Sequence, residues 1–336
     1  MEAAQKSWEI ENAISLVDPT RDALYNYSAT QHASLTAAKP WLSQPRYFTS
    51  IRISAVALLK MVMHARSGGS LEVMGLMLGY IAANTFVVTD AYRLPVEGTE
   101  TRVNAHDEAN EYMVQYLQSC RDQGRMENAI GWYHSHPGYG CWLSGIDVMT
   151  QSTHQQFNDP FVAVVIDPDR TISAGKVEIG AFRTFPGGSE EATGSGTKVD
   201  PDGYQSVPLS KAEDFGAHAS QYYSLEVSHF KSTLDTKILS LLWNKYWVAT
   251  ISQSPLFTNR DYGNKQMADL SQRVKRVTRT IQNGVGREGG FSFEKDTELD
   301  KIVRDGKRIV GEEMSGLMAA EIKRGLFEGV THTAQK

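Results

Sequence analysis

Residues 131–147 read GWYHSHPGYGCWLSGID, a pattern typical of a strand, a glycine-rich turn and the start of a helix. Side chains two positions apart on a strand share a face, so His134 and His136 can place two imidazoles beside one ion. Ser144 is a good N-cap for the helix, and Asp147 in its first turn can swing back as a third ligand. Two histidines and one carboxylate suit zinc and leave one coordination position open. The stretch therefore predicts a zinc site in a mixed α/β domain.

An open position on zinc is typical of catalytic sites, because the metal lowers the pKa of a bound water molecule to about 7. Such a water molecule needs a proton acceptor. Glu72 is our candidate, since it lies between Leu71 and Val73 at the start of an apolar strand, where a charge is unusual. Glu72 is therefore a candidate general base, although sequence spacing alone does not show that it reaches the site.

The same residues also have a purely structural interpretation. Ser144 and Asp147 can serve only as an N-cap and a favourable first-turn charge, which together stabilise a helix by about 1 kcal/mol. A histidine pair alone is more often structural than metal-binding. Ser135 is a poor candidate for a nucleophile, because it points away from the strand face that His134 and His136 share.

The apolar pattern around this stretch alternates between helical and strand periods. It predicts helices over Ser54–Arg66, Asp107–Arg121 and Ser144–Gln156, a hairpin of Leu71–Ile81 with Phe86–Tyr92, and strands over Ala129–His136, Phe161–Ile166 and Lys176–Phe185. These elements predict one α/β domain over residues 47–185, with a central mixed sheet flanked by helices.

Three further segments differ from this domain in composition. Residues 1–46 are interpreted as an N-terminal arm, extended except for a short helix near Trp8 to Leu16. Residues 186–230 are interpreted as a flexible linker, because glycine and small polar residues crowd its first part. Residues 231–336 have helical periodicity and an aromatic cluster at Trp243, Tyr246 and Trp247. We expect a C-terminal helical assembly region there, with an intramolecular helical hairpin as the alternative.

The composition excludes several classes of function. The chain has 336 residues, of which 41% are apolar and 22% charged, as in ordinary folded proteins. Its net charge of −5 argues against nucleic acid as a partner. Two cysteines provide no disulfide framework and favour a reducing compartment. The longest uncharged run, 73–89, is too short to cross a bilayer, and the first residues lack a secretory signal, so we expect neither a membrane partner nor secretion.

The motif resembles the JAMM motif of the MPN-domain metalloproteases, which cleave isopeptide bonds to ubiquitin-like proteins. The resemblance rests on the segments 134–137 and 144–147, the seven residues between His136 and Ser144, and the upstream Glu72. It implies the MPN fold for residues 47–185 and one zinc ion per chain, bound by His134, His136 and Asp147. It also implies that Glu72 acts as general base and later acid, and that Ser144 supports the oxyanion.

Segments outside the motif narrow the resemblance to the signalosome members of this family. Residues 59–69, 94–105 and 242–247 carry that similarity. It implies a zinc isopeptidase that removes the ubiquitin-like modifier Nedd from cullin subunits of cullin-RING ubiquitin ligases. The enzyme would act in the cytoplasm and nucleus, within a signalosome whose other subunits it contacts through its C-terminal helices. The alternatives are a JAMM deubiquitinase acting on ubiquitin chains and a non-catalytic MPN scaffold.

The segment between Leu94 and Asp107 contains charged and small residues and few apolar ones, so we expect it to be exposed. Glu97 or Glu100 can supply a carboxylate that competes for an open zinc position, or Arg102 can instead pair with Asp147 and hold the loop over the site. We therefore expect Glu100 and Arg102 to be regulatory residues that restrain the isolated chain. An ordinary solvated loop is the alternative interpretation.

Overall fold

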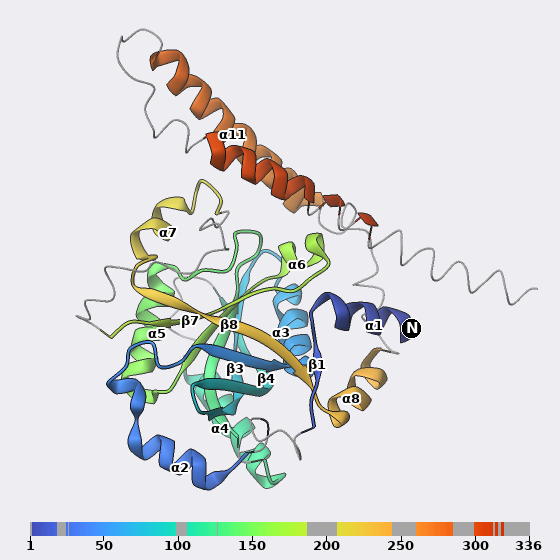
Figure 1. The fold of residues 1–336 in the computed structure, drawn as a ribbon, viewed down its shortest axis with the longest axis vertical. Coiled ribbons are helices and arrows are strands. Elements are labelled where there is room, and N and C mark those ends of the chain that lie inside the picture. Colours follow the sequence, from blue (N-terminus) through green and yellow to red (C-terminus); the bar gives the residue numbers. More distant parts are fainter. Residues whose placement is uncertain are drawn as a thin grey trace, which may run out of the picture.

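The computed structural model describes residues 2–18, 25, 27–98, 106–125, 127–186, 207–243, 260–284, 299–311, 313–314 and 317–318. They form a mixed sheet flanked by helices, from which a pair of C-terminal helices projects (Figure 1). The predicted α/β class is thereby confirmed. Among the described residues, no helix has the length and apolar character needed to span a membrane.

The sheet contains eight strands, two of which carry Glu72 and His134 of the predicted site. The strands are β1 (Ser15–Leu16), β2 (Ser50–Ser54), β3 (Glu72–Ala82), β4 (Thr85–Gly98), β5 (Asn128–Ser135), β6 (Val162–Asp167), β7 (Glu178–Thr184) and β8 (Tyr222–Lys231). Their order is β1-β8-β2-β4-β3-β5-β6-β7, and β8 also pairs with β7. The sheet is therefore closed on itself from β8 round to β7.

The labelled helices lie on both faces of the sheet and beyond its ends. They are α1 (Glu2–Glu11), α2 (Ala29–Ala38), α3 (Ala55–Ser67), α4 (His106–Asp122), α5 (Gly145–Asn158), α6 (Pro168–Ala174), α7 (Ala212–His218), α8 (Thr233–Trp243) and α11 (Arg260–Gly284), with a 3-10 helix over Pro40–Leu42. Residues 299–311 are also helical. The helices and strands predicted between residues 54 and 185 are all present, whereas β2 and α6 were not predicted.

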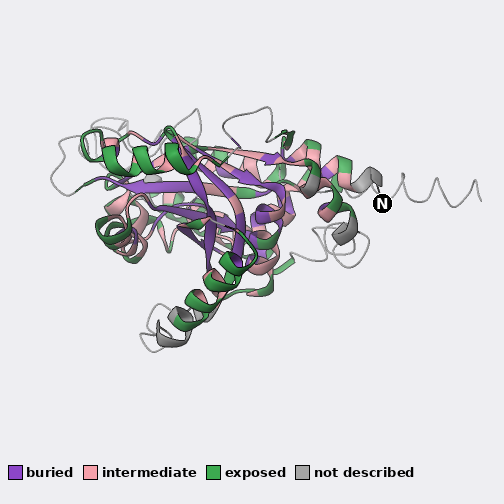
Figure 2. Cartoon of the chain, turned by 90° about the horizontal axis from the view of Figure 1, so that it is seen from below, coloured by how far each residue is buried: buried purple, intermediate pink, exposed green. Residues whose placement is uncertain are grey.

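Strand β5 lies inside the sheet, antiparallel to β3 and parallel to β6. Alternate side chains enter different apolar cores, because strand residues alternate between faces. Tyr133 packs in the core that contains α3, whereas Trp132 packs in the core that contains part of α5. Figure 2 shows buried strands at the centre of the molecule. The rigid strand β5 thus holds His134 on the α5 side of the sheet.

The prediction of an extended N-terminal arm over residues 1–46 is wrong for most of its described part. Helix α1 precedes β1, which adds to the sheet beside β8, and α2 follows. Trp8 and Trp41 are 6% and 5% exposed and belong to the main apolar core. Asn12 accepts a hydrogen bond from the backbone N–H of Val177 at 2.9 Å. Tertiary burial of these side chains orders a segment whose local sequence has little periodicity.

The linker prediction for residues 186–230 is also wrong in its second half. Residues 187–206 lie outside the described part of the chain, but α7 and β8 follow them. Tyr222 and Leu225 are buried, and β8 pairs with β1, β2 and β7. Aromatic and β-branched residues over 222–230 favour a strand, and the glycine-rich composition applies only to the residues before them.

The C-terminal region contains two helices that contact each other. Arg273 on α11 pairs with Asp305 at 3.1 Å, which joins α11 to residues 299–311 (Figure 1). The intramolecular hairpin is thus present in the described residues, while apolar side chains along 299–318 stay exposed, among them Val303 (50%) and Val310 (59%). Of the predicted aromatic cluster, Tyr246 and Trp247 lie outside the described residues, as does the side chain of Trp243.

Candidate active site

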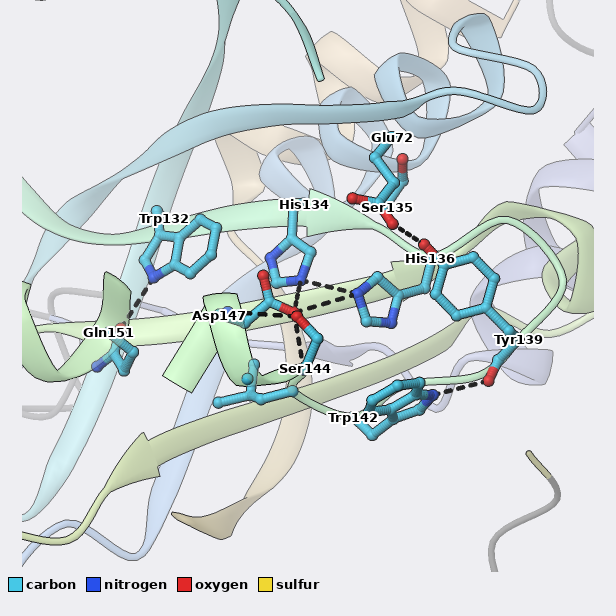
Figure 3. A network of polar contacts seen from close by, with 12 residues as sticks. Glu72, Trp132, His134, Ser135, His136, Tyr139, Trp142, Ser144, Asp147 and Gln151 are labelled. Carbon is cyan, nitrogen blue, oxygen red and sulfur yellow. Dashed lines mark hydrogen bonds and ion pairs between the residues drawn. The ribbon is translucent and has the colours of Figure 1, made fainter. Parts of the chain in front are cut away.

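Three side chains converge at the end of β5 and the start of α5 (Figure 3). His134 Nε2 lies 3.1 Å from His136 Nε2. Asp147 Oδ2 lies 3.4 Å from His134 Nε2 and 3.5 Å from His136 Nε2. Both histidines are buried, at 4% and 2% exposure. The structure therefore brings the three predicted ligands together, in a group whose ligand atoms all lie within 4.8 Å of one another.

The separations of these atoms fit a small divalent ion. Donor atoms about 2.1 Å from a tetrahedral zinc ion lie about 3.4 Å from one another. The three observed separations, 3.1, 3.4 and 3.5 Å, lie close to that value. Two imidazole nitrogens and one carboxylate oxygen form a donor set that zinc accepts. The arrangement can thus hold a metal and leave one coordination position open.

Asp147 is oriented by the N-terminus of α5. Its Oδ2 accepts hydrogen bonds from the Ser144 backbone N–H at 2.9 Å and from the Ser144 hydroxyl at 2.7 Å. Ser144 Oγ in turn accepts from the Asp147 N–H, which completes a capping box. Ser144 and Asp147 therefore cap helix α5 and at the same time hold a candidate metal ligand in position. The structural and the metal-binding interpretations of these two residues are thus compatible.

The pKa of Asp147 lies well below its ordinary value. Burial is the largest influence and would raise this pKa, but the positive charge of His134, the hydrogen bonds from both histidines and the charge of His136 together outweigh it. The carboxylate therefore stays ionised between its neighbours. An ionised carboxylate is the form that binds a cation.

His134 is held by aromatic stacking. The indole of Trp132 lies parallel to its ring, with centroids 4.5 Å apart. Trp132 Nε1 donates to the buried Gln151 Oε1 at 2.9 Å, which fixes the indole. His134 Nδ1 is buried without a hydrogen-bond partner among the described residues. The Nδ1 side of this imidazole is thus held by packing against Trp132, while Nε2 faces His136 and Asp147.

His136 is held by the turn that follows it. The Tyr139 ring stacks on its imidazole at 4.5 Å, and Trp142 meets it edge-on at 5.5 Å. His136 Nδ1 lies 3.1 Å from the carbonyl oxygen of Gly140. In the neutral imidazole, a proton on Nδ1 is donated to this carbonyl and the Nε2 lone pair is left to bind a cation between His134 and Asp147.

Glu72 lies at the start of β3 and reaches the group through Tyr139. The Tyr139 hydroxyl donates a hydrogen bond to Glu72 Oε1, while the Tyr139 ring stacks on His136. Ser135 lies on the opposite face of β5, where its buried Oγ accepts from the Val73 N–H at 3.0 Å. The carboxylate predicted as a base is thus beside the candidate site, and Ser135 is directed away from it.

Helix α7 and the residues before it also border the site, which the sequence did not predict. Lys211 Nζ lies 5.3 Å from the centre of the Tyr139 ring, and Phe215 packs edge-on against Trp142 at 5.7 Å. Asp214 accepts from the N–H of Gly145, the first residue of α5, at 3.3 Å. The sequence gives one indication that this segment packs against the domain, namely the aromatic residue Phe215 within a polar stretch.

A cleft of about 590 Å³ separates the turn after β5 from the C-terminal helices. Its lining includes Gly138 and Tyr139 on one side, and Tyr262, Lys265 and Arg308 on the other. Since Tyr139 also stacks on His136, the cleft adjoins the candidate site. The two predicted regulatory residues, Glu100 and Arg102, lie outside the described residues, and their role stays a prediction.

Comparison with known proteins adds independent information. Residues 46–160 match the family model described as "JAB1/Mov34/MPN/PAD-1 ubiquitin protease", and residues 252–328 match "Cop9 signalosome subunit 5 C-terminal domain". The chain is 69% identical over 335 residues to COP9 signalosome complex subunit 5 of Aspergillus fumigatus, covering 100% of this chain and 99% of that protein. It is 50% identical to the protein of the same name in Dictyostelium discoideum, covering 99% and 98%. For COP9 signalosome complex subunit 5a of Arabidopsis thaliana, the identity is 52%, covering 96% and 92%.

Proposed function

Because the chain belongs to the COP9 signalosome subunit 5 family and contains its JAB/MPN domain, we propose that it is a zinc isopeptidase that removes the modifier Nedd from cullins. Family membership identifies the catalytic subunit of a signalosome and a JAMM-type hydrolase in general. The observation that supports a zinc-dependent isopeptidase in particular is the convergence of His134, His136 and Asp147 on one point. A non-catalytic scaffold has no need of such a donor set.

In this proposal, His134 Nε2, His136 Nε2 and Asp147 Oδ2 hold one zinc ion per chain. When bound, zinc polarises a carbonyl oxygen and lowers the pKa of a coordinated water molecule to about 7. The stacked rings of Trp132 and Tyr139 keep the two imidazoles in place. Preorganised ligands of this kind need little rearrangement when the ion binds.

Glu72 is proposed as the group that moves the proton. Its Oε1 accepts the Tyr139 hydroxyl, which holds the carboxylate at the edge of the site. A carboxylate there takes a proton from the attacking water as the new C–O bond forms at the isopeptide carbonyl. The same proton then goes to the lysine nitrogen as the C–N bond breaks.

Ser144 is proposed to support the oxyanion that develops at this carbonyl. Its hydroxyl donates its one proton to Asp147 Oδ2 in the structure, so in this proposal it turns from Asp147 to the oxyanion while the Ser144 backbone N–H keeps the ligand oriented. Both tasks suit a residue at a helix N-terminus, where N–H groups favour negative charge.

The choice of substrate is tested with the assembled complex. We expect a neddylated cullin to be cleaved at least about tenfold faster than linked ubiquitin chains, a difference of about 1.4 kcal/mol in transition-state binding. Initial rates under the same conditions measure this ratio. Equal or faster cleavage of ubiquitin chains would favour the deubiquitinase alternative, and zinc-loaded complex that cleaves neither would favour the scaffold.

The C-terminal helices are proposed to join the other subunits of the signalosome. A truncation after residue 230 would remove the last residue of β8 and the fully buried Leu239 of α8, so the cut belongs after Trp243. We expect the chain that ends at Trp243 to fold and to retain zinc but to lose co-purification with the other subunits. Zinc analysis and affinity purification measure these properties.

A milder variant tests the exposed apolar side chains of residues 299–318. Val303→Asp with Val310→Asp is expected to weaken co-purification without changing zinc content or thermal stability, because neither side chain enters a core. Normal assembly of the truncated chain would contradict the proposal.

We also propose a cytoplasmic and nuclear location, in agreement with the free thiols of Cys120 and Cys141.

A further inference from the structure

Asp167 is a buried carboxylate at the end of β6, beside the candidate site. Its side chain is 0% exposed. Oδ1 accepts the backbone N–H groups of Gly138 at 3.0 Å, Asp169 at 3.0 Å and Arg170 at 2.9 Å. Oδ2 accepts the N–H of Gly140 at 2.8 Å and lies 3.2 Å from Arg170 Nε. A buried charge is costly unless it is paired and hydrogen-bonded, and these four backbone donors together with the charge of Arg170 meet that requirement.

The bonds to Gly138 and Gly140 tie the turn after His136 to the sheet. Both glycines have positive φ angles, +84° and +93°. A Cβ on Gly140 would lie 2.8 Å from Arg170 Nη1, so this backbone packs directly against the partner of Asp167. The turn therefore takes its shape from backbone conformations that suit glycine and from one carboxylate that receives two of its N–H groups.

Gly140 also contacts a proposed metal ligand. Its carbonyl oxygen lies 3.1 Å from His136 Nδ1, while its N–H donates to Asp167. The His136 backbone N–H in turn donates to Ile166, the residue before Asp167, at 2.9 Å. Asp167 thus fixes the residue that orients the His136 ring, and the neighbouring strand residue fixes the His136 backbone.

We propose that Asp167 is a positioning residue of the metal site, which acts on His136 through Gly140 and on Glu72 through Tyr139 of the same turn. The inference rests on the proposed zinc site and goes beyond it, since Asp167 contacts none of the three ligand side chains. Partners in the outer shell of a metal site commonly change its affinity about 10- to 100-fold when they are replaced. Asp167 acts one step further out, through a backbone carbonyl.

The test compares zinc affinity of the full chain, measured by competition with a chelator, for Asp167→Asn and Asp90→Asn. The asparagine side chain keeps one acceptor oxygen, which can still accept the three N–H groups now bound to Oδ1. Its NH₂ group replaces Oδ2 and cannot accept the Gly140 N–H, so this hydrogen bond is lost. Asp90 is a matched control, because it is also buried (8%) and bonded to Lys60 and Arg125, but lies on β4, across β3 from β5. We expect zinc affinity to fall about tenfold or more in Asp167→Asn only.

A spectroscopic readout separates positioning from general loss of stability. Cobalt in place of zinc reports ligand geometry through its visible absorption, and we expect the bands to shift in Asp167→Asn but not in Asp90→Asn. Gly140→Ala, which keeps Asp167 but displaces the turn, is a second variant and is expected to shift them as well.

The experiment distinguishes failure of the proposed metal site from failure of the proposed role of Asp167. Failure of the wild-type chain to bind zinc would refute the proposed metal site itself. Zinc affinity and cobalt spectra of Asp167→Asn that match the wild type, or that change equally in the Asp90 control, would overturn the role of Asp167 and leave the metal site intact.

Discussion

Replacing His134 with alanine is expected to remove bound zinc and all measurable isopeptidase activity. The site has three protein donors, and the group formed by the described residues contains no fourth side chain to replace a lost imidazole. The loss is expected to be specific, because the pairing of β5 with Met74 on β3 and Val165 on β6 uses backbone groups that the substitution leaves in place. Elemental analysis measures the zinc, and cleavage of a neddylated cullin by the assembled complex measures the activity.

His154→Ala is the matched control for this experiment. His154 lies on α5, and its ring stacks on Phe161 at 4.6 Å, outside the converging group. We expect this variant to keep stoichiometric zinc. If His134→Ala also keeps stoichiometric zinc, the ligand assignment is wrong.

Glu72→Gln is expected to slow catalysis by about 100- to 10,000-fold while zinc content stays unchanged, since general acid–base catalysis commonly contributes that much. The glutamine keeps the size of the side chain and an oxygen that can accept the Tyr139 hydroxyl, so the local packing is retained. What is lost is the capacity to take and return a proton. The effect should appear in kcat, measured with the assembled complex and saturating substrate.

Glu127→Gln provides the corresponding control. Glu127 lies just before β5 and pairs with Arg125 at 3.5 Å, so its loss removes a carboxylate without touching the site. We expect its rate to stay within a few fold of the wild type. A Glu72→Gln enzyme with near-normal kcat, or with depleted zinc, would rule out Glu72 as the general base.

The candidate site was predictable because its signals are local. His134, His136, Ser144 and Asp147 lie within one strand-turn-helix unit, where the strand period and the N-cap rule determine which side chains can meet. The placement of Glu72 depends on the pairing of β3 with β5 through Met74 and His134, a long-range contact that the local patterns did not specify. Short-range patterns therefore account for the convergence of His134, His136 and Asp147, but not for the position of Glu72.

The parts that were missed depend on contacts between distant segments. The side chain of Trp8 has no apolar periodicity around it and is buried only because the sheet offers it a core. The same holds for Phe215, whose partner Trp142 lies far away in the sequence. Asp167 carried a weak local signal, a carboxylate between an apolar run and Pro168 that is typical of an N-cap, but its bonds to Gly138 and Gly140 follow from the fold alone.

The closure of the sheet by β8 has a consequence for synthesis on the ribosome. Until residues 222–231 have emerged, β2 and β7 each have one unpaired edge, the edge that β8 later covers, although the residues of the predicted metal site have already been made. Unpaired strand edges are prone to associate with other chains. The nascent chain is therefore most vulnerable to aggregation during translation of the stretch between β7 and β8, and each residue inserted there prolongs that interval.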